Sequence, residues 1–234
     1  MFGPVTATPY DLQFHISGIP VRVHPGFWIF GALLGWTPGV ARLLEHNILA
    51  VVLVWLACLF LSILVHELGH ALVARAFGWP PAIMLYHFGG LAMYSPGSRH
   101  TPMRSIAISI AGPGAGFILF GIVYVIDVAL IANGNPPRGF AWWAIASLKF
   151  VNLWWGLLNL LPVLPLDGGR ICESALEVMR LRNHQEIALK IAVGAGACAA
   201  FLLWRLGLVF AGLMFVYLAV QNYQALQHRR RGGW

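Results

Sequence analysis

An uncharged apolar stretch that ends in two histidines and a glutamate constrains this chain more than any other feature. No charged residue occurs from Leu49 to Val65, and a helix of this length crosses most of the apolar layer of a bilayer. His66 and His70 follow one helical turn apart, so their imidazoles share a helix face and can bind one metal ion. Glu67 flanks that face, where its carboxylate can hold a metal-bound water. Because ionisable side chains are costly inside a membrane, the sequence predicts a functional metal site within a membrane-spanning helix.

The composition is that of an integral membrane protein. Of the 234 residues, 59% are hydrophobic and 10% are charged, whereas soluble domains have about 25% charged residues. Spans and short loops fill this length, so we expect a single membrane-embedded domain over residues 1–234. The formal charge of +7 comes mostly from arginines near loops and the tail. That placement predicts orientation in a lipid bilayer and no nucleic-acid partner.

The pattern of apolar segments predicts an all-α polytopic membrane protein with about six transmembrane helices. It also predicts an N-terminal interfacial segment over residues 1–25, in which residues 10–25 form a short β-hairpin that turns at Gly18. No cleavable signal peptide is expected there. The expected spans are 27–44, 48–77, 104–130 and 140–161, followed by two within 187–226 that turn near Arg205. A polar helical connector is expected over residues 168–186.

Residues 78–100 are too broken by proline and glycine for a span, yet too apolar for an exposed loop. Ile83 to Tyr94, around Gly89 and Gly90, is expected to form a re-entrant β-hairpin. Backbone of this kind is tolerated at membrane depth only where protein or a water-filled cavity covers it.

The distribution of basic residues predicts the orientation of the chain. With both termini in the cytosol, most arginines fall in cytosolic segments, and the outer loops carry only Arg42, Arg138 and Arg205. This asymmetry follows the positive-inside rule and favours an even number of spans.

Two histidines leave a catalytic zinc site incomplete, since such sites commonly have three protein ligands. Asp167 is the best candidate for the third, because the second and fourth predicted spans run in the same direction and end on the same side. The alternative is that Asp167 caps the helix that follows it. His87 and His100 have no spacing that supports a ligand role.

A polar stripe follows one face of the fourth predicted span. Lys149, Asn152, Gly156 and Asn159 are spaced so that all four share this face, which should point into the bundle. Asn152 can equally form an ordinary interhelical hydrogen bond, and Lys149 either snorkels or pairs with Asp127. Asn159 can donate to a substrate carbonyl or to its developing oxyanion.

With these residues the chain resembles the site-2 protease family of intramembrane zinc metalloproteases. Two motifs carry the resemblance: His66-Glu67-Leu68-Gly69-His70, and the segment from Asn159 to Gly169 that contains Pro162, Pro165, Asp167 and Gly168. Phe88-Gly89-Gly90 and Ala111-Gly112-Pro113 strengthen it. The chain is most similar to the compact six-span group that includes the sporulation-factor processing proteases.

The resemblance implies one Zn²⁺ per chain, held by His66, His70 and Asp167. It implies Glu67 as the general base and Asn159 near the scissile bond. It also implies that the hairpin at 83–95, with Gly89 and Gly90, aligns an unwound substrate by strand addition. One departure is Gly116, which stands where the family commonly has asparagine.

The expected function is hydrolysis of peptide bonds within or near transmembrane segments of single-span or membrane-anchored proteins, which releases a regulatory fragment. The catalytic core is expected over about 48–170, and a C-terminal helical pair over about 187–226, all in the cell membrane. The alternatives are a catalytically silent membrane scaffold and a metal transporter that retains the zinc site.

Overall fold

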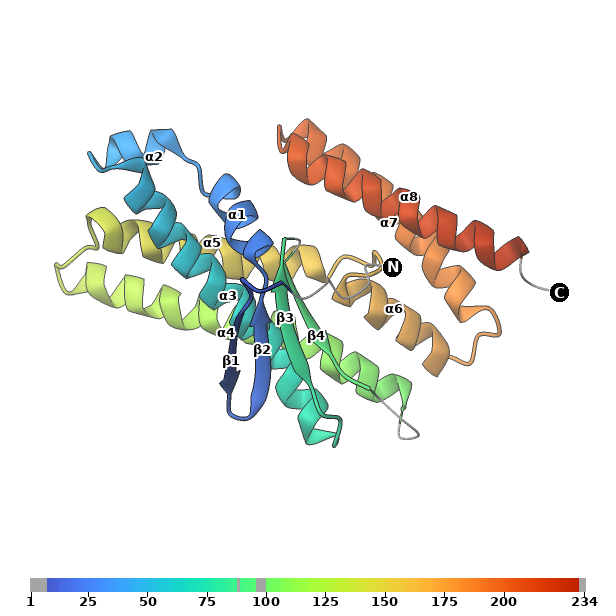
Figure 1. The fold of residues 1–234 in the computed structure, drawn as a ribbon. Coiled ribbons are helices and arrows are strands. Elements are labelled where there is room, and N and C mark those ends of the chain that lie inside the picture. Colours follow the sequence, from blue (N-terminus) through green and yellow to red (C-terminus); the bar gives the residue numbers. More distant parts are fainter. Residues whose placement is uncertain (1–7, 88, 96–99, 232–234) are drawn as a thin grey trace. The chain divides into compact units, whose positions relative to one another are not determined.

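The computed structural model describes residues 8–87, 89–95 and 100–231 (Figure 1). In chain order its elements are β1 (Leu12–Ile16), β2 (Ile19–Val23), α1 (Pro25–Leu34), α2 (Pro38–Leu43), α3 (Ile48–Ala76), β3 (Ala82–Tyr86), β4 (Gly89–Met93), α4 (Pro102–Ala132), α5 (Gly139–Asn159), α6 (Asp167–Val178), α7 (His184–Arg205) and α8 (Val209–Arg231). The fold is a helical membrane fold with a small sheet, as predicted.

Cα packing divides the chain into two compact units, which are described separately. Of the described residues, the N-terminal unit comprises 8–87, 89–95 and 111–156, and the C-terminal unit comprises 100–110 and 157–231. Helices α4 and α5 contribute residues to both.

Both predicted β-hairpins of the N-terminal unit are present. Strands β1 and β2 are antiparallel and are joined by a turn in which Ser17 and Gly18 have φ of 49° and 80°. Strands β3 and β4 form the second hairpin, in which Tyr86 pairs with Gly89. The first turn requires left-handed backbone, which glycine adopts readily. Gly18 in the sequence therefore marks the position of this turn.

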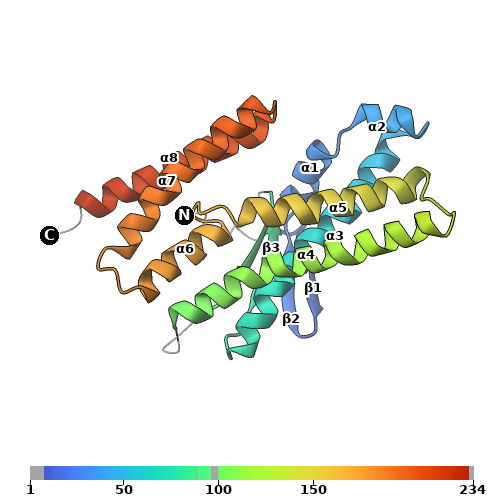
Figure 2. The same cartoon turned by 180° about the vertical axis from the view of Figure 1, so that it is seen from behind.

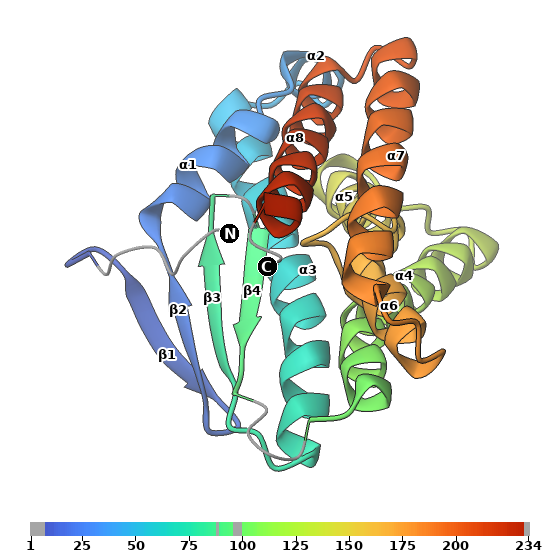
Figure 3. The same ribbon diagram turned by 90° about the vertical axis from the view of Figure 1, so that its right-hand side faces the viewer.

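The two hairpins join into one four-stranded sheet, which the sequence analysis did not predict. Strand β2 pairs with β3 in parallel, with Val21 opposite Ile83, so the order is β1-β2-β3-β4. The backbone N–H of His24 extends this pairing by donating to the Leu85 carbonyl at 2.8 Å. Strands β1 and β4 are therefore the two edges of the sheet (Figure 3).

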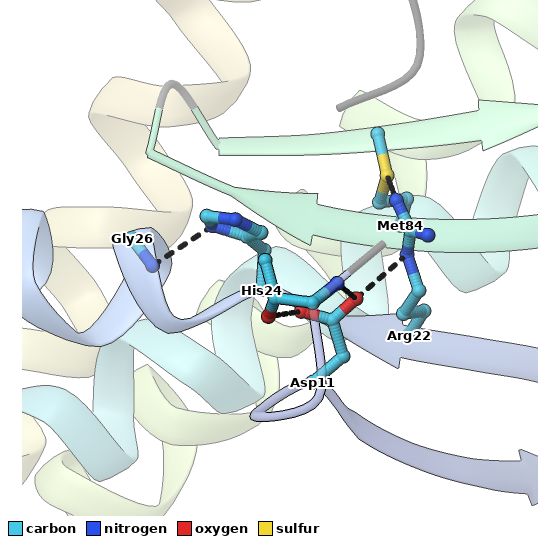
Figure 4. A network of polar contacts seen from close by, with 6 residues as sticks. Asp11, Arg22, His24, Gly26 and Met84 are labelled. Atoms are coloured by element: carbon cyan, nitrogen blue, oxygen red, sulfur yellow. Dashed lines mark hydrogen bonds and ion pairs between the residues drawn. The ribbon is translucent and has the colours of Figure 1, made fainter. Parts of the chain in front are cut away.

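A polar network fastens the first hairpin to β3 (Figure 4). The guanidinium of Arg22 lies 3.5 Å from the Asp11 carboxylate, and its Nη2 lies 2.7 Å from Met84 Sδ. Thr8 Oγ1 donates to Asp11 Oδ1 at 2.6 Å. This hydroxyl, together with the nearby Arg22, lowers the pKa of the Asp11 carboxyl from its ordinary value. Asp11 therefore stays ionised beside Arg22, just before β1.

The expected span over 27–44 forms two short helices, so the prediction of one span here needs correction. Helix α1 begins at Pro25 and is capped by His24, whose Nδ1 accepts from Gly26 N at 2.9 Å (Figure 4). It ends before Gly35, and α2 starts at Pro38. Proline disfavours helical backbone in the residue before it, so the chain breaks here and restarts.

In the described residues, four helices are long and apolar enough to cross a membrane: α3, α4, α7 and α8. Helix α1 is apolar but shorter. Helix α5 has 21 residues but is not among the four, because Lys149, Asn152 and its other polar residues lower its hydropathy. The predicted count of six spans is therefore not confirmed, although a multi-pass membrane protein is.

The core of the N-terminal unit forms where the sheet packs against α1 and α3. Ile19, Val21, Val23, Ile83 and Leu85 come from the sheet and are almost completely buried. They contact α1 and α3 side chains, and the parts of α4 and α5 in this unit pack on α3 as well (Figure 2). This packing fixes the part of α3 that carries His66 and His70 beside the sheet.

In the C-terminal unit, α7 and α8 form the predicted helical pair (Figure 3). They are joined at Gly207, whose φ of 76° suits glycine, close to the turn expected near Arg205. Helix α6 is the predicted polar connector. The core of this unit places Phe215 and Leu218 of α8 against Val163, which lies in the segment between α5 and α6.

Candidate metal centre

Helix α3 brings the two histidines of the motif together, as predicted. His66 and His70 are only 2% and 6% exposed, and their Nε2 atoms lie 3.2 Å apart. Two nitrogens bound to a tetrahedral zinc at about 2.0–2.1 Å lie roughly 3.3 Å from each other. The pair therefore fits one zinc ion with little movement of either ring.

Helix α4 forms a close-fitting cover over this pair. A Cβ added at Gly112 would lie 2.1 Å from His70 Nε2. A Cβ added at Gly69 would lie 2.3 Å from the Ala111 carbonyl oxygen. The glycines of both motifs are thus explained by one helix crossing, because a larger residue would separate α3 from α4 or displace the His70 imidazole.

Glu67 points toward the edge strand of the sheet. Its side chain is 4% exposed, and a Cβ added at Gly90 of β4 would lie 2.4 Å from Glu67 Oε1. A Cβ at the neighbouring Gly89 would lie 2.6 Å from Trp155. The two hairpin glycines therefore let the backbone of β4 approach α3 and α5 closely.

The pairing pattern shows which way the polar groups of β4 point. The Leu85 carbonyl faces β2, since it accepts from His24 N. Leu85 is opposite Gly90. Because the polar groups of Leu85 face β2, these two residues form a non-hydrogen-bonded pair of the antiparallel ladder. The N–H and C=O of Gly90, and by alternation those of Ala92, consequently point to the outer edge of the sheet.

Asn152 forms an interhelical hydrogen bond, which was one of the alternatives that the sequence allowed. The bond stabilises the turn of α3 before His66. Asn152 of α5 donates from Nδ2 to Ser62 Oγ at 2.8 Å, and Ser62 donates to the Cys58 carbonyl at 2.7 Å. A Cβ at Gly116 would lie 3.7 Å from Asn152 Oδ1. An amide is thus present beside Gly116, the position that departs from the family pattern. Sequence reasoning missed Ser62, although a lone polar residue one turn before His66 was a usable signal.

Lys149 forms an ion pair with Asp127 of α4. Of the two predicted alternatives for Lys149, snorkelling and pairing with Asp127, the structure therefore shows the pairing. The Lys149 ammonium and the Asp127 carboxylate neutralise each other between two apolar helices, where unpaired charge would be costly. His100 has its own partner, with Nε2 at 2.9 Å from Ser105 Oγ.

The remaining predicted residues belong to the C-terminal unit. Asn159 is the last residue of α5, and Asp167 is the first residue of α6. The capping position of α6 is Leu166, which makes no side-chain cap. Asp167 is half-buried and begins the helix itself. The alternative in which Asp167 serves as the cap therefore lacks support.

Comparison with known proteins places this site in a family. The family model "Peptidase family M50" matches residues 54–133 and 128–203, which include both motifs. A zinc metalloprotease of Methanocaldococcus jannaschii is 30% identical over 224 residues, covering 93% of this chain and 60% of that protein. Stage IV sporulation protein FB of Bacillus subtilis is 28% identical over 216 residues, covering 90% of this chain and 67% of that protein.

A solved structure agrees with these relatives. The site-2 protease from Methanocaldococcus jannaschii has a TM-score of 0.55 and 27% sequence identity, with 94% of each chain covered. Fold and site together define a membrane protein whose helix α3 carries a histidine pair able to bind zinc. The chain belongs to peptidase family M50, and its cofactor is zinc. It spans about half to two thirds of the length of the curated relatives that it matches.

Proposed function

We propose that this chain hydrolyses peptide bonds within or near the transmembrane segments of membrane-anchored proteins. One observation carries the proposal: the buried carboxylate of Glu67, one residue after His66, lies against Gly90 of β4, which is an edge strand of the sheet among the described residues. A general base, a metal-binding pair and a surface for an extended peptide therefore occupy one place in the N-terminal unit.

The edge of β4 is suited to an unwound substrate. Gly90 and Ala92 direct their N–H and C=O groups outward, and strand addition uses such groups with little dependence on sequence. Because Gly89 and Gly90 have no Cβ, an added strand can run close to Glu67. A helix must unwind to bind there, since its own hydrogen bonds shield the scissile carbonyl.

Asp167 is proposed as the third protein ligand. With His66 and His70 it makes a donor set of two imidazoles and one carboxylate, which suits zinc and leaves a position open for water. Zinc bound there supplies Lewis-acid chemistry, polarising the scissile carbonyl and acidifying water. One ion per chain is expected.

Glu67 and Asn159 are proposed to act on the reacting groups. The Glu67 carboxylate accepts a proton from the attacking water and later delivers it to the leaving amine. Burial suits this role, because exclusion of bulk water strengthens the interactions of the carboxylate with the reacting groups. Asn159, eight residues before Asp167, donates to the developing oxyanion.

The substrates proposed are single-span or membrane-anchored proteins, cleaved to release a regulatory fragment. Both termini of the chain are proposed to be cytosolic, because the basic residues concentrate in the segments that this orientation places inside. Cleavage on that side would release the fragment into the cytosol.

Reconstitution with a single-span substrate tests the proposal. The wild-type chain, Glu67→Gln and the double variant His66→Ala/His70→Ala are placed in vesicles, and cleavage and bound zinc are measured on the same samples. We expect Glu67→Gln to keep zinc and lose cleavage by about a hundredfold or more. The double variant should lose both.

The same samples separate the alternatives. Cleavage by Glu67→Gln at the wild-type rate would remove Glu67 as the base. Bound zinc without cleavage of any substrate in a broad panel would favour the silent scaffold. Zinc movement across the vesicle membrane, unaffected by Glu67→Gln, would favour the transporter.

A further inference from the structure

The segment between α5 and α6 is folded tightly against the start of α6. Val163, which is fully buried, donates from N to the Leu161 carbonyl at 2.7 Å, and Leu166 N donates to the Val163 carbonyl at 2.8 Å. A Cβ added at Gly168 would lie 2.1 Å from the Leu160 carbonyl oxygen. The backbone of residues 160–166 therefore determines where α6 begins, and with it the position of Asp167.

A side chain from α8 holds this segment. Asn222 is 3% exposed, and its Nδ2 donates to the Leu164 carbonyl at 2.6 Å as well as to the Leu218 carbonyl at 2.8 Å. Leu164 and Asn222 are 58 positions apart in the sequence. The contact thus ties the C-terminal helix to a point three residues before Asp167.

The acceptor distinguishes this contact from ordinary helix packing. A carbonyl inside a helix already accepts from the residue four positions later, whereas Leu164 lies outside any helix and the residue that follows it is Pro165. An amide in an apolar helix is costly and is usually functional. The rest of this face of α8, including Phe215 and Leu218, is apolar core. The Asn222 amide among these apolar side chains is best explained by its hydrogen bond to the Leu164 carbonyl.

We propose that Asn222 is a positioning residue for the zinc ligand Asp167. By holding the Leu164 carbonyl, it fixes the backbone that enters α6 and thereby the direction of the Asp167 carboxylate. This inference rests on the proposed role of Asp167 as a ligand. It gives α8 an indirect role in metal binding, through the backbone that carries Asp167.

Metal affinity measures this role independently of proteolysis. Zinc affinity is determined by competition with a chelator, and coordination is followed in the visible spectrum of the Co²⁺-substituted protein. Asn222→Leu removes the donor at similar volume. In Asn222→Ser the side chain is too short to contact Leu164, but its hydroxyl can still donate to the Leu218 carbonyl in its own helix. We expect both to bind zinc about ten- to a hundredfold more weakly, as for other residues that orient metal ligands.

Two further variants separate positioning from packing. Leu218→Ala weakens the same core without touching the Leu164 carbonyl, so its zinc affinity and Co²⁺ spectrum should match the wild type. Asn222→Gln keeps an amide donor on a longer side chain and should recover most of the affinity lost in Asn222→Ser. Wild-type affinity and spectrum in Asn222→Ser would overturn the proposal, as would an equal loss in Leu218→Ala.

Asp167→Ala in the same titration distinguishes the inference from the proposed site. If Asp167→Ala weakens zinc binding while Asn222→Ser and Asn222→Leu do not, the inference fails and the site stands. If Asp167→Ala binds zinc as tightly as the wild type, Asp167 is not a ligand and both fail.

Discussion

Asn152 Nδ2 and Ser62 Oγ are 2.8 Å apart, and Ser62 lies one helical turn before His66. Asn152 also donates to the Leu148 carbonyl of its own helix at 2.9 Å. The amide therefore bridges α5 to the turn of α3 that leads into the metal-binding motif. This hydrogen bond helps to hold the turn of α3 before His66 in the position that lets Gly112 of α4 contact His70.

A double-mutant cycle measures this bridge. Asn152→Ala, Ser62→Ala and the double variant are unfolded in detergent, and the free energies of unfolding are compared. Interhelical hydrogen bonds in membranes contribute roughly 0.6–1.7 kcal/mol, so we expect a coupling energy of about 1 kcal/mol. Asn133→Ala is the control, because Asn133 is exposed, lies just after α4, and its side chain donates to the Ala129 carbonyl of that helix. A coupling energy of zero would show that the contact does not stabilise the fold.

Gly112 and Gly114 form a matched pair for testing the cover of the metal site. A Cβ at Gly112 would lie 2.1 Å from His70 Nε2, whereas a Cβ at Gly114 meets nothing within 4 Å. We expect Gly112→Ala to weaken zinc binding by roughly tenfold or more, as perturbed ligand orientation does, and Gly114→Ala to leave it unchanged. Equal affinities in the two variants, measured by chelator competition, would contradict the close contact.

The Lys149–Asp127 pair predicts an asymmetry between single and double variants. Lys149→Met alone leaves the Asp127 carboxylate without its partner in apolar surroundings. Because Lys149 is only half-buried, we expect a cost of roughly 1–3 kcal/mol. The double variant Lys149→Met/Asp127→Leu removes both charges, so it should be close to wild-type stability. Thermal unfolding in the same detergent compares them. A double variant less stable than Lys149→Met would assign the pair a role beyond mutual neutralisation.

The sequence predicted those features that are encoded locally. His66, Glu67 and His70 share a helix, so their spacing alone places them on one side of it. The hairpin of β3 and β4 likewise follows from alternating apolar residues with Gly89 and Gly90 between them, although both glycines lie in β4 itself. Both are relationships between residues close in the chain.

Relationships between distant segments were not predictable from such patterns. The parallel pairing of β2 with β3 depends on backbone groups, which every residue carries, so no side-chain signal marks it. Gly112 was noticed as a small residue, but its contact with His70 depends on how α4 crosses α3. The need for glycine at position 35 also has a distant cause, because a Cβ there would lie 2.2 Å from the Trp55 ring.

The pairing of β3 with β4 makes a directional prediction about substrate binding. Ala92 points its N–H to the outer edge of the sheet, whereas Leu91 points its N–H toward β3. Ala92→Pro therefore removes a donor available to a substrate while the hairpin keeps its own bonds, since proline is tolerated on edge strands. One main-chain hydrogen bond is worth up to about 1.5 kcal/mol. We expect cleavage to fall roughly tenfold, with zinc content and thermal stability unchanged.

Two control variants test whether the effect of Ala92→Pro comes from the outer edge of β4. Ala92→Ser keeps the N–H at similar size and should cleave like the wild type. Leu91→Pro breaks the hairpin's own ladder, so it should lower thermal stability together with cleavage. All three variants are assayed for cleavage, zinc and unfolding on the same preparations. If the hairpin only closes the mouth of the helix bundle, Ala92→Pro should loosen that closure and leave cleavage equal or higher. Undiminished cleavage in a stable, zinc-loaded Ala92→Pro protein would therefore exclude strand addition at β4.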